Sequence, residues 1–176
     1  LVPMRAILDA ADKNGYAQGA FNVNAVCQVK AAVDVHQILR SPAIIQGADL
    51  ANGFMGGRTD FANSTLEDKK AGAKNIGAAV KKYAADSDIP VALHLDHGKN
   101  FDSCIAAIEG GYTSVMIDGS SLPFDENVEL TREVVKYAHE RGVTVEGELG
   151  VLAGVEDHVF AATSTYTNPL SAIDFF

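Results

Sequence analysis

Basic residues, cysteines and long apolar stretches are all scarce in this sequence, and each shortage excludes a class of protein. The chain has 176 residues, with 14 lysines and arginines against 23 aspartates and glutamates, so its formal net charge is −9 at pH 7. Nucleic acids and anionic membranes attract basic surfaces, and we therefore expect no nucleic-acid and no membrane partner. No apolar run reaches the ~18 residues of a transmembrane helix. The start also lacks the basic and apolar segments of a signal peptide.

The two cysteines, Cys27 and Cys104, lie far apart and match no metal-ligand spacing. Both fall in segments with helical periodicity, so we interpret them as buried free thiols rather than as a disulfide pair. Unpaired cysteines are typical of a reducing compartment. The sequence therefore predicts a cytoplasmic protein.

Composition and periodicity indicate a globular α/β protein. Hydrophobic residues make up 47% of the sequence and charged residues 21%, which is ordinary for a folded protein, and we expect residues 1–176 to form a single domain. Residues 47–64 are rich in glycine and asparagine and are predicted to be a loop. The predicted strands cover residues 19–24, 43–46, 91–95, 113–117 and 143–148, and the predicted helices cover residues 1–14, 25–39, 65–83, 101–109, 125–141 and 168–176.

This alternation leaves two architectures open, a doubly wound parallel sheet and a (β/α)8 TIM barrel. The first strand is not followed by the glycine-rich turn of a dinucleotide site, which weighs against the doubly wound sheet. Polar residues instead follow the ends of several strands, among them Asn22, Asp96, Asp118 and Glu148, and the carboxyl ends of barrel strands converge on one face. We therefore predict a TIM barrel. A complete barrel needs about 250 residues, so this chain covers about the first five strands.

The motif His94-Leu-Asp-His-Gly98 ends the third predicted strand. Asp96 offers a carboxylate for proton transfer, and His97 offers an imidazole that can bind a divalent metal. Neighbouring residues of a regular strand point to opposite faces, so we expect His97 to lie where the strand turns into its loop, with Gly98 permitting the bend. A solvated loop pair is the alternative for an isolated Asp-His dipeptide.

Two glutamates share one face of the fifth predicted strand. Alternation places Glu146 and Glu148 on the side that points into the barrel, and buried carboxylates need a cation, a proton or hydrogen-bond donors. Because alternate strands share interior layers, we expect His94 to pair with Glu146, and Asp96 and Glu148 to lie nearer the mouth. The alternative for His94 is an ordinary core histidine.

The remaining polar residues are less informative by themselves. Asp118 follows the fourth strand and is either a metal ligand or the cap of the next segment. Glu156 lies in a glycine-bounded loop that alone indicates a solvated turn. His36 and His139 lie on polar helix faces and are interpreted as surface residues. No lysine occupies a predicted strand, where a Schiff base would require one, which favours a metal for carbonyl chemistry.

Taken together, the motifs resemble those of class II, metal-dependent fructose-bisphosphate aldolases and the related tagatose-bisphosphate aldolases. The resemblance implies a zinc enzyme on a (β/α)8 barrel, a homodimer or higher homo-oligomer, that cleaves a ketose bisphosphate into dihydroxyacetone phosphate and an aldehyde. With fructose 1,6-bisphosphate the aldehyde is glyceraldehyde 3-phosphate, and the reaction belongs to glycolysis and gluconeogenesis. The resemblance covers essentially the whole chain and rests on GAFNVN at 19–24, HLDHG at 94–98, SVMIDGS at 114–120, FDEN at 124–127, VEGELG at 145–150 and GVED at 154–157.

Three residues match metal ligands of that family. His97 matches the first of three histidines that hold the catalytic zinc ion, and Asp118 and Glu148 match ligands of a second divalent or monovalent cation in some members. The resemblance places the other two zinc histidines and the main phosphate-binding segments after strands six to eight, beyond Phe176. We therefore expect this chain alone to be inactive.

Three further residues match positions close to the phosphorylated sugar substrate. Asp96 matches the acid/base that handles the proton of the C4 hydroxyl, Glu156 matches the loop glutamate that moves the proton on the enolising carbon, and Asn22 matches a polar residue near the substrate. Ala48 stands where many relatives have a phosphate-contacting serine, and it has no hydroxyl to donate.

Two alternatives to fructose-bisphosphate cleavage stay open at this point. A tagatose-bisphosphate aldolase differs only in the stereochemistry of one substrate hydroxyl, which none of these residues decides. A truncated, non-catalytic barrel would act through interactions, and its unpaired strand edges would need a partner.

Overall fold

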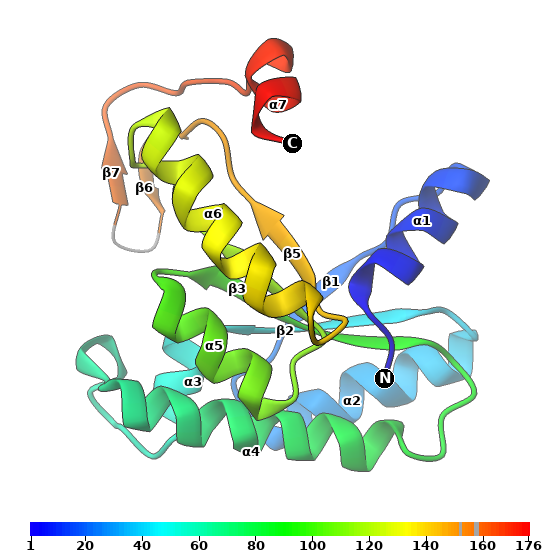
Figure 1. The fold of residues 1–176 in the computed structure, drawn as a ribbon. Helices are drawn as coiled ribbons and strands as arrows, with labels where there is room; N and C mark the ends of the chain where they lie inside the picture. The colour runs from blue at the N-terminus through cyan, green and yellow to red at the C-terminus, as the bar shows by residue number, and fades with distance from the viewer. Residues whose placement is uncertain (152, 157–158) are drawn as a thin grey trace.

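A five-stranded parallel sheet forms the centre of the protein (Figure 1). The computed structural model describes residues 1–151, 153–156 and 159–176. The strands pair in chain order, and each of the first four is followed by a helix, which is the arrangement of consecutive β/α units in a barrel. They are β1 (Ala20–Asn22), β2 (Ala43–Ala48), β3 (Val91–Gly98), β4 (Ser114–Ile117) and β5 (Thr144–Gly147).

Helices begin close to where the sequence predicts them. Thr65 caps α4 through a capping box with Asp68, and Asn168 caps α7 with Pro169 in its first turn. No helix within the described ranges is long and apolar enough to cross a membrane. The helices are α1 (Met4–Asn14), α2 (Val26–Leu39), α3 (Asp49–Met55), α4 (Leu66–Ala84), α5 (Phe101–Gly110), α6 (Phe124–His139) and α7 (Pro169–Phe175), and a 3-10 turn covers Phe61–Asn63.

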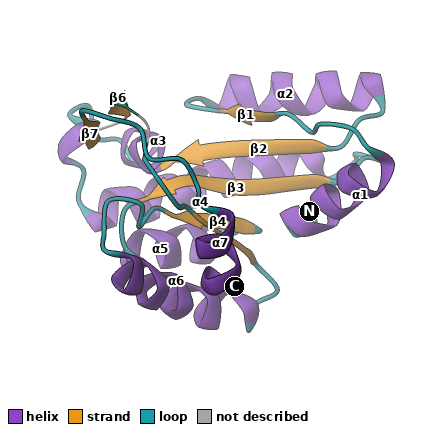
Figure 2. Cartoon of the chain, turned by 90° about the horizontal axis from the view of Figure 1, so that it is seen from above, coloured by secondary structure: helices purple, strands orange, loops and turns teal. Residues whose placement is uncertain are grey.

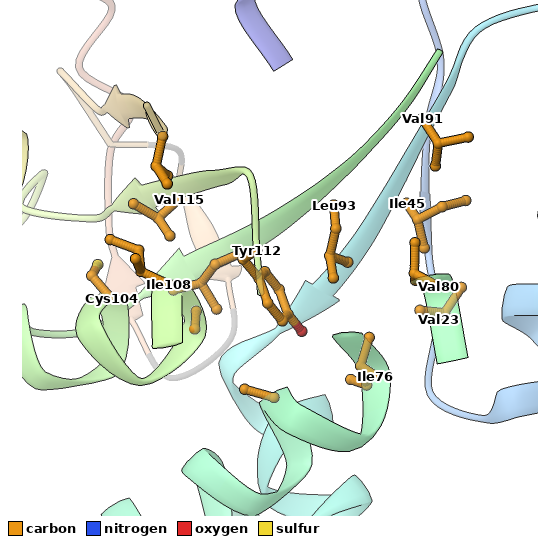
Figure 3. Packing of buried hydrophobic residues seen from close by; sticks show 14 of the residues in the cluster. Val23, Ile45, Ile76, Val80, Val91, Leu93, Cys104, Ile108, Tyr112 and Val115 are labelled. Carbon is orange, nitrogen blue, oxygen red and sulfur yellow. The ribbon is translucent and has the colours of Figure 1, made fainter. Parts of the chain in front are cut away.

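The main hydrophobic core lies on the outer face of the sheet, between the strands and helices α2, α4 and α5 (Figure 3). Ile45 of β2 and Leu93 of β3 are fully buried there, next to Tyr112. Burying a side chain of this size stabilises the fold by about 1.5–3 kcal/mol. This face therefore anchors the strands whose opposite side carries the polar residues.

The inner face of the sheet has a smaller apolar cluster at one end. Ile44 and Ala92 are paired in register, and Met4 and Ile7 of α1 pack on them. Figure 2 shows α1 near the amino ends of β2 and β3. Strand alternation then places His94, two residues after Ala92, on this same inner face.

Residues 47–64 contain α3 and the 3-10 turn, so the prediction of a loop there was wrong. Asp49, at the start of α3, forms a buried ion pair with Lys69 at 2.5 Å. Asn52 accepts a hydrogen bond from the Tyr112 hydroxyl at 2.8 Å. These long-range contacts stabilise a helix that its glycine and asparagine content does not favour.

The segment after β5, in which Glu156 was predicted to lie in a loop, has regular structure. It contains an antiparallel hairpin, β6 (Gly154–Glu156) and β7 (Val159–Ala161). Helix α7 follows this hairpin (Figure 1). Phe175 of α7 packs edge-on against Phe124 of α6 with ring centroids 6.2 Å apart.

Two side chains differ from their predicted burial. Cys27 is exposed on α2, whereas Cys104 is buried as predicted, and both are free thiols. His36 is only 8% exposed rather than on the surface. Its ring packs edge-on against Phe21 at 5.2 Å, and its Nδ1 lies 2.7 Å from the Ala32 carbonyl oxygen. The aromatic contact and the hydrogen bond together explain why a histidine is buried there.

Helices α4 and α5 pack with backbone contact at Gly77, where a Cβ would lie 2.0 Å from the Gly110 carbonyl oxygen. Gly77→Ala is therefore expected to push the helices apart and to lower the free energy of unfolding by roughly 1–3 kcal/mol, despite the higher helix propensity of alanine. Chemical denaturation measures the change. Lys74→Ala, at an exposed position of the same helix, is the control, and equal stability of the two variants would contradict the close packing.

Candidate metal centre and active site

An irregularity in β3 lets the neighbouring residues Asp96 and His97 both reach the polar end of the sheet. The register between β3 and β4 shifts just before Gly98, and His97 has a φ of 49°, in the left-handed region. A non-glycine residue in this region is uncommon, and such residues cluster at functional sites. The bulge therefore overrides the strict alternation of a regular strand.

Gly98 has a different role from the predicted one. The strand continues through Gly98, and the left-handed residue is His97 rather than the glycine, so the prediction that Gly98 permits the bend was wrong. A Cβ on Gly98 would lie 2.6 Å from the Met116 carbonyl oxygen and 2.9 Å from Sγ of Cys104. Glycine is needed there because β4 and α5 approach the backbone closely.

The imidazole of His97 lies between two carboxylates from neighbouring strands. Its Nδ1 lies 3.0 Å from Oδ2 of Asp118, which follows β4, and 3.8 Å from Oε2 of Glu148, which follows β5. The hydrogen bond between His97 and Asp118 raises the pKa of His97 to about 9 and lowers the pKa of Asp118 to about 2. Ser120 adds a second hydrogen bond to Asp118, from its hydroxyl at 2.6 Å. All three of the sequence-predicted metal ligands therefore come together.

The donor set of this group fits a divalent metal. One ligand atom from each of His97, Asp118 and Glu148 lies within 4.8 Å of the other two. Zinc binds imidazole nitrogen and carboxylate oxygen atoms at distances of about 2.0–2.2 Å, so two ligand atoms that share one ion lie up to about 4.4 Å apart. The group thus needs only small side-chain adjustments to hold an ion, and a carboxylate on the imidazole is a common way to orient a histidine ligand.

Asp96 lies at the end of a hydrogen-bond chain across β1, β2 and β3. Gln46 donates from Nε2 to Oδ1 of Asn22 at 2.6 Å, and Asn22 donates from Nδ2 to Oδ2 of Asp96 at 3.2 Å. These two hydrogen bonds fix which side of the Asn22 amide faces the Asp96 carboxylate. Gln46 was not predicted to be a site residue, and its signal in the sequence is its position at the end of the second strand.

His94 and Glu146 form the contact predicted from strand alternation. Nε2 of His94 lies 3.4 Å from Oε2 of Glu146, and Nδ1 lies 2.8 Å from the Ser114 hydroxyl oxygen. His94 is 2% exposed, and this burial lowers its pKa to about 4. Burial, followed by the charge of Asp96, raises the pKa of Glu146. The prediction that His94 faces the barrel interior is confirmed.

A wide cavity lies on the inner face of the sheet, and Gln46, His94, Glu146 and Glu148 all line it. Glu156 lies in β6, where its backbone pairs with Val159. The side chain of Glu156 is outside the described part of the structure, so its role stays a prediction. The structure thus groups His97 with its two carboxylates and Asp96 with Asn22.

The sequence model of class II fructose-bisphosphate aldolases matches residues 2–176. The chain belongs to this family. The fructose-bisphosphate aldolase of Treponema pallidum (strain Nichols) is 46% identical over 179 residues, which cover 99% of this chain and 50% of the relative. The fructose-bisphosphate aldolase of Geobacillus stearothermophilus is 41% identical over 171 residues, which cover 96% of this chain and 54% of the relative. The chain therefore spans about half the length of the curated relatives it matches.

A solved aldolase has the same fold as this class II family member. The crystal structure of the YdjI aldolase from Escherichia coli K12 superimposes with a TM-score of 0.74 at 28% identity, covering 99% of this chain and 55% of that structure. The five parallel strands and this match confirm the prediction of a partial TIM barrel. Class II aldolases are generally metal-dependent, and the group of His97, Asp118 and Glu148 gives this chain residues that can hold a metal ion.

Proposed function

We propose that this chain carries the acid/base residue and the first metal ligand of an aldolase that reversibly cleaves fructose 1,6-bisphosphate to dihydroxyacetone phosphate and glyceraldehyde 3-phosphate. The observation that supports this most is the bulged end of β3, where Asp96 contacts Asn22 while His97 contacts Asp118. A base and a metal-binding group side by side are what metal-assisted carbon–carbon cleavage requires. The names of the curated relatives favour fructose over tagatose bisphosphate.

Zinc is the ion that we assign to the site. His97 would be the ligand from this chain to the catalytic zinc, and Asp118 and Glu148 would orient its imidazole or hold a second cation. The mixed nitrogen and oxygen donors of this group suit zinc. A bound zinc ion would act as a Lewis acid that stabilises the negative charge developing as the C3–C4 bond breaks.

The protons are moved by carboxylates of this chain. In the direction of cleavage, Asp96 accepts the proton of the C4 hydroxyl, and in the direction of synthesis it returns that proton. The hydrogen bond from Asn22 at 3.2 Å holds the Asp96 carboxylate in place for this transfer. Glu156 moves the proton on the enolising carbon, and its position on the segment after β5 suits a loop that closes over the substrate and excludes water.

The proposal includes a phosphorylated sugar as substrate and a cytoplasmic homodimer or larger homo-oligomer, with residues 1–176 as part of one barrel domain. Ala48 ends β2 in register with Asp96, which places it close to the proposed site. Because alanine has no hydroxyl, a substrate phosphate at this position must bind backbone amides or water.

Removal of metal from the full-length protein is expected to lower aldol cleavage by at least about 100-fold, because a Lewis acid supplies several kcal/mol of charge stabilisation. Added zinc is expected to restore the rate. The measurement is aldehyde release after dialysis against a strong chelator, with metal content determined on the same samples. Borohydride with substrate is expected to trap no covalent adduct. Full activity in metal-free protein, or a trapped adduct, would contradict the proposal.

A further inference from the structure

A second polar chain lies on the inner face of the sheet and joins β4, β3 and β5. The Ser114 hydroxyl oxygen lies 2.8 Å from Nδ1 of His94, and Nε2 of His94 lies 3.4 Å from Oε2 of Glu146. Ser114 is fully buried and His94 almost so, whereas the Glu146 side chain is 46% exposed. The chain therefore leads from the core to a carboxylate on the wall of the cavity.

The chemistry of the three groups determines which ring nitrogen of His94 carries the proton. Burial keeps the pKa of His94 near 4, so its imidazole is neutral at physiological pH and carries a single N–H. A lone pair on Nε2 would face the Glu146 carboxylate at 3.4 Å, so the proton of the neutral imidazole lies on Nε2, and Nδ1 accepts from the Ser114 hydroxyl. Each buried polar group then has a partner, which makes the arrangement rigid.

This support exceeds what a solvated glutamate needs. An exposed carboxylate is satisfied by water, whereas burying a serine and a histidine beneath it costs desolvation free energy, which their mutual hydrogen bond and the contact with Glu146 offset. Residues that fix the orientation of a polar group in this way are typical of binding sites. The contact with His94 also leaves Glu146 with further acceptor capacity, because a carboxylate has about four lone-pair sites.

The position of Glu146 indicates the kind of group that it would bind. It lines the cavity together with Gln46 and Glu148, and Asp96 is near enough to affect its pKa. Carboxylates repel phosphate and accept hydrogen bonds from hydroxyl groups. This wall of the cavity therefore suits the hydroxyl-bearing carbon chain of a sugar phosphate and keeps the phosphates away from it.

We propose that Glu146 is a further substrate-binding residue, whose carboxylate accepts a hydrogen bond from a hydroxyl of the sugar phosphate. His94 and Ser114 are positioning residues that hold this carboxylate. The inference rests on the proposed aldolase function and adds to it a contact from β5 to a hydroxyl of the substrate.

The test is steady-state kinetics of the full-length holoenzyme with fructose 1,6-bisphosphate. Glu146→Gln keeps the shape of the side chain but removes the charge-assisted hydrogen bond, and it is expected to raise KM about tenfold while kcat changes less than threefold. Ser114→Ala, which loosens His94, is expected to raise KM about threefold. Glu133→Gln, an exposed glutamate of α6, is the control and is expected to match the unmodified enzyme.

Separate outcomes distinguish this inference from the proposed function. KM within twofold of the unmodified value in both Glu146→Gln and Ser114→Ala would overturn the inference, even if both variants unfold at lower temperature. A fall in kcat at constant KM would also overturn it. If the unmodified protein shows no cleavage, the proposed function fails. The inference about Glu146 is then tested by calorimetric titration with fructose 1,6-bisphosphate. Binding that Glu146→Gln weakens about tenfold supports the inference, and absence of binding overturns it.

Discussion

Replacement of Asp96 by asparagine is expected to lower kcat for aldol cleavage by about 10²–10⁴-fold, because general acid–base catalysis contributes this much. Asparagine has nearly the same shape and can still accept the hydrogen bond that Asn22 donates at 3.2 Å, but it cannot take up the proton of the C4 hydroxyl. The zinc content of the full-length protein should stay unchanged. The measurement combines steady-state kinetics with metal analysis of the same preparation.

The metal content separates a catalytic from a structural effect of this substitution. Asp86→Asn, at an exposed position after α4, is the matched control and should retain the normal rate. If Asp96→Asn keeps a near-normal kcat, Asp96 is not the acid/base. If it loses zinc together with activity, its role is to hold the metal group rather than to transfer a proton.

Strand alternation predicts the inner face of the sheet well. The strand period of two residues places His94 on the same face as Ala92 and predicts its contact with Glu146, which the structure shows at 3.4 Å. This succeeds because a residue buried on the wrong face would cost several kcal/mol, which forces the side chains of a parallel sheet into a strict period. The fold class follows from the same alternation of strands and helices.

The geometry of the metal group could not be derived from the strand period alone. A regular strand would point Asp96 and His97 to opposite faces, and the register shift before Gly98 depends on how β4 and α5 pack against it. Such a bulge is a long-range property that a local sequence pattern does not encode. Resemblance to a family predicted the ligand residues, but not the left-handed conformation that brings His97 to Asp118.

Helix α3 shows the same limit on a larger scale. Its sequence has the composition of a loop, and its helical state is stabilised by the ion pair of Asp49 with Lys69 and by the hydrogen bond from Tyr112 to Asn52. These partners lie 20 and 60 residues away in the chain. Local propensity is a weak prior where such tertiary contacts are available. The same holds for His36, which is buried through Phe21 of a different element.

Replacement of His97 by alanine is expected to weaken zinc binding to the full-length protein by more than about 100-fold, and activity should fall with metal occupancy. The expectation follows from the position of its imidazole, with Nδ1 3.0 Å from Asp118 and 3.8 Å from Glu148. Loss of a residue that only orients a ligand costs about 10–100-fold in metal affinity, so loss of the ligand itself should cost more. Competition with a chromophoric chelator measures the affinity.

Asp118→Asn and His139→Ala make this prediction specific to a ligand role. If Asp118 orients the imidazole, its asparagine variant should lose about 10–100-fold in zinc affinity, and excess zinc should restore its activity. His139 is an exposed histidine at the end of α6, and His139→Ala should bind zinc normally. Normal zinc affinity in His97→Ala would show that the bulge of β3 presents this side chain for another purpose. A weaker effect for His97→Ala than for Asp118→Asn would instead make the carboxylate the principal ligand, because only a direct donor outweighs the group that positions it.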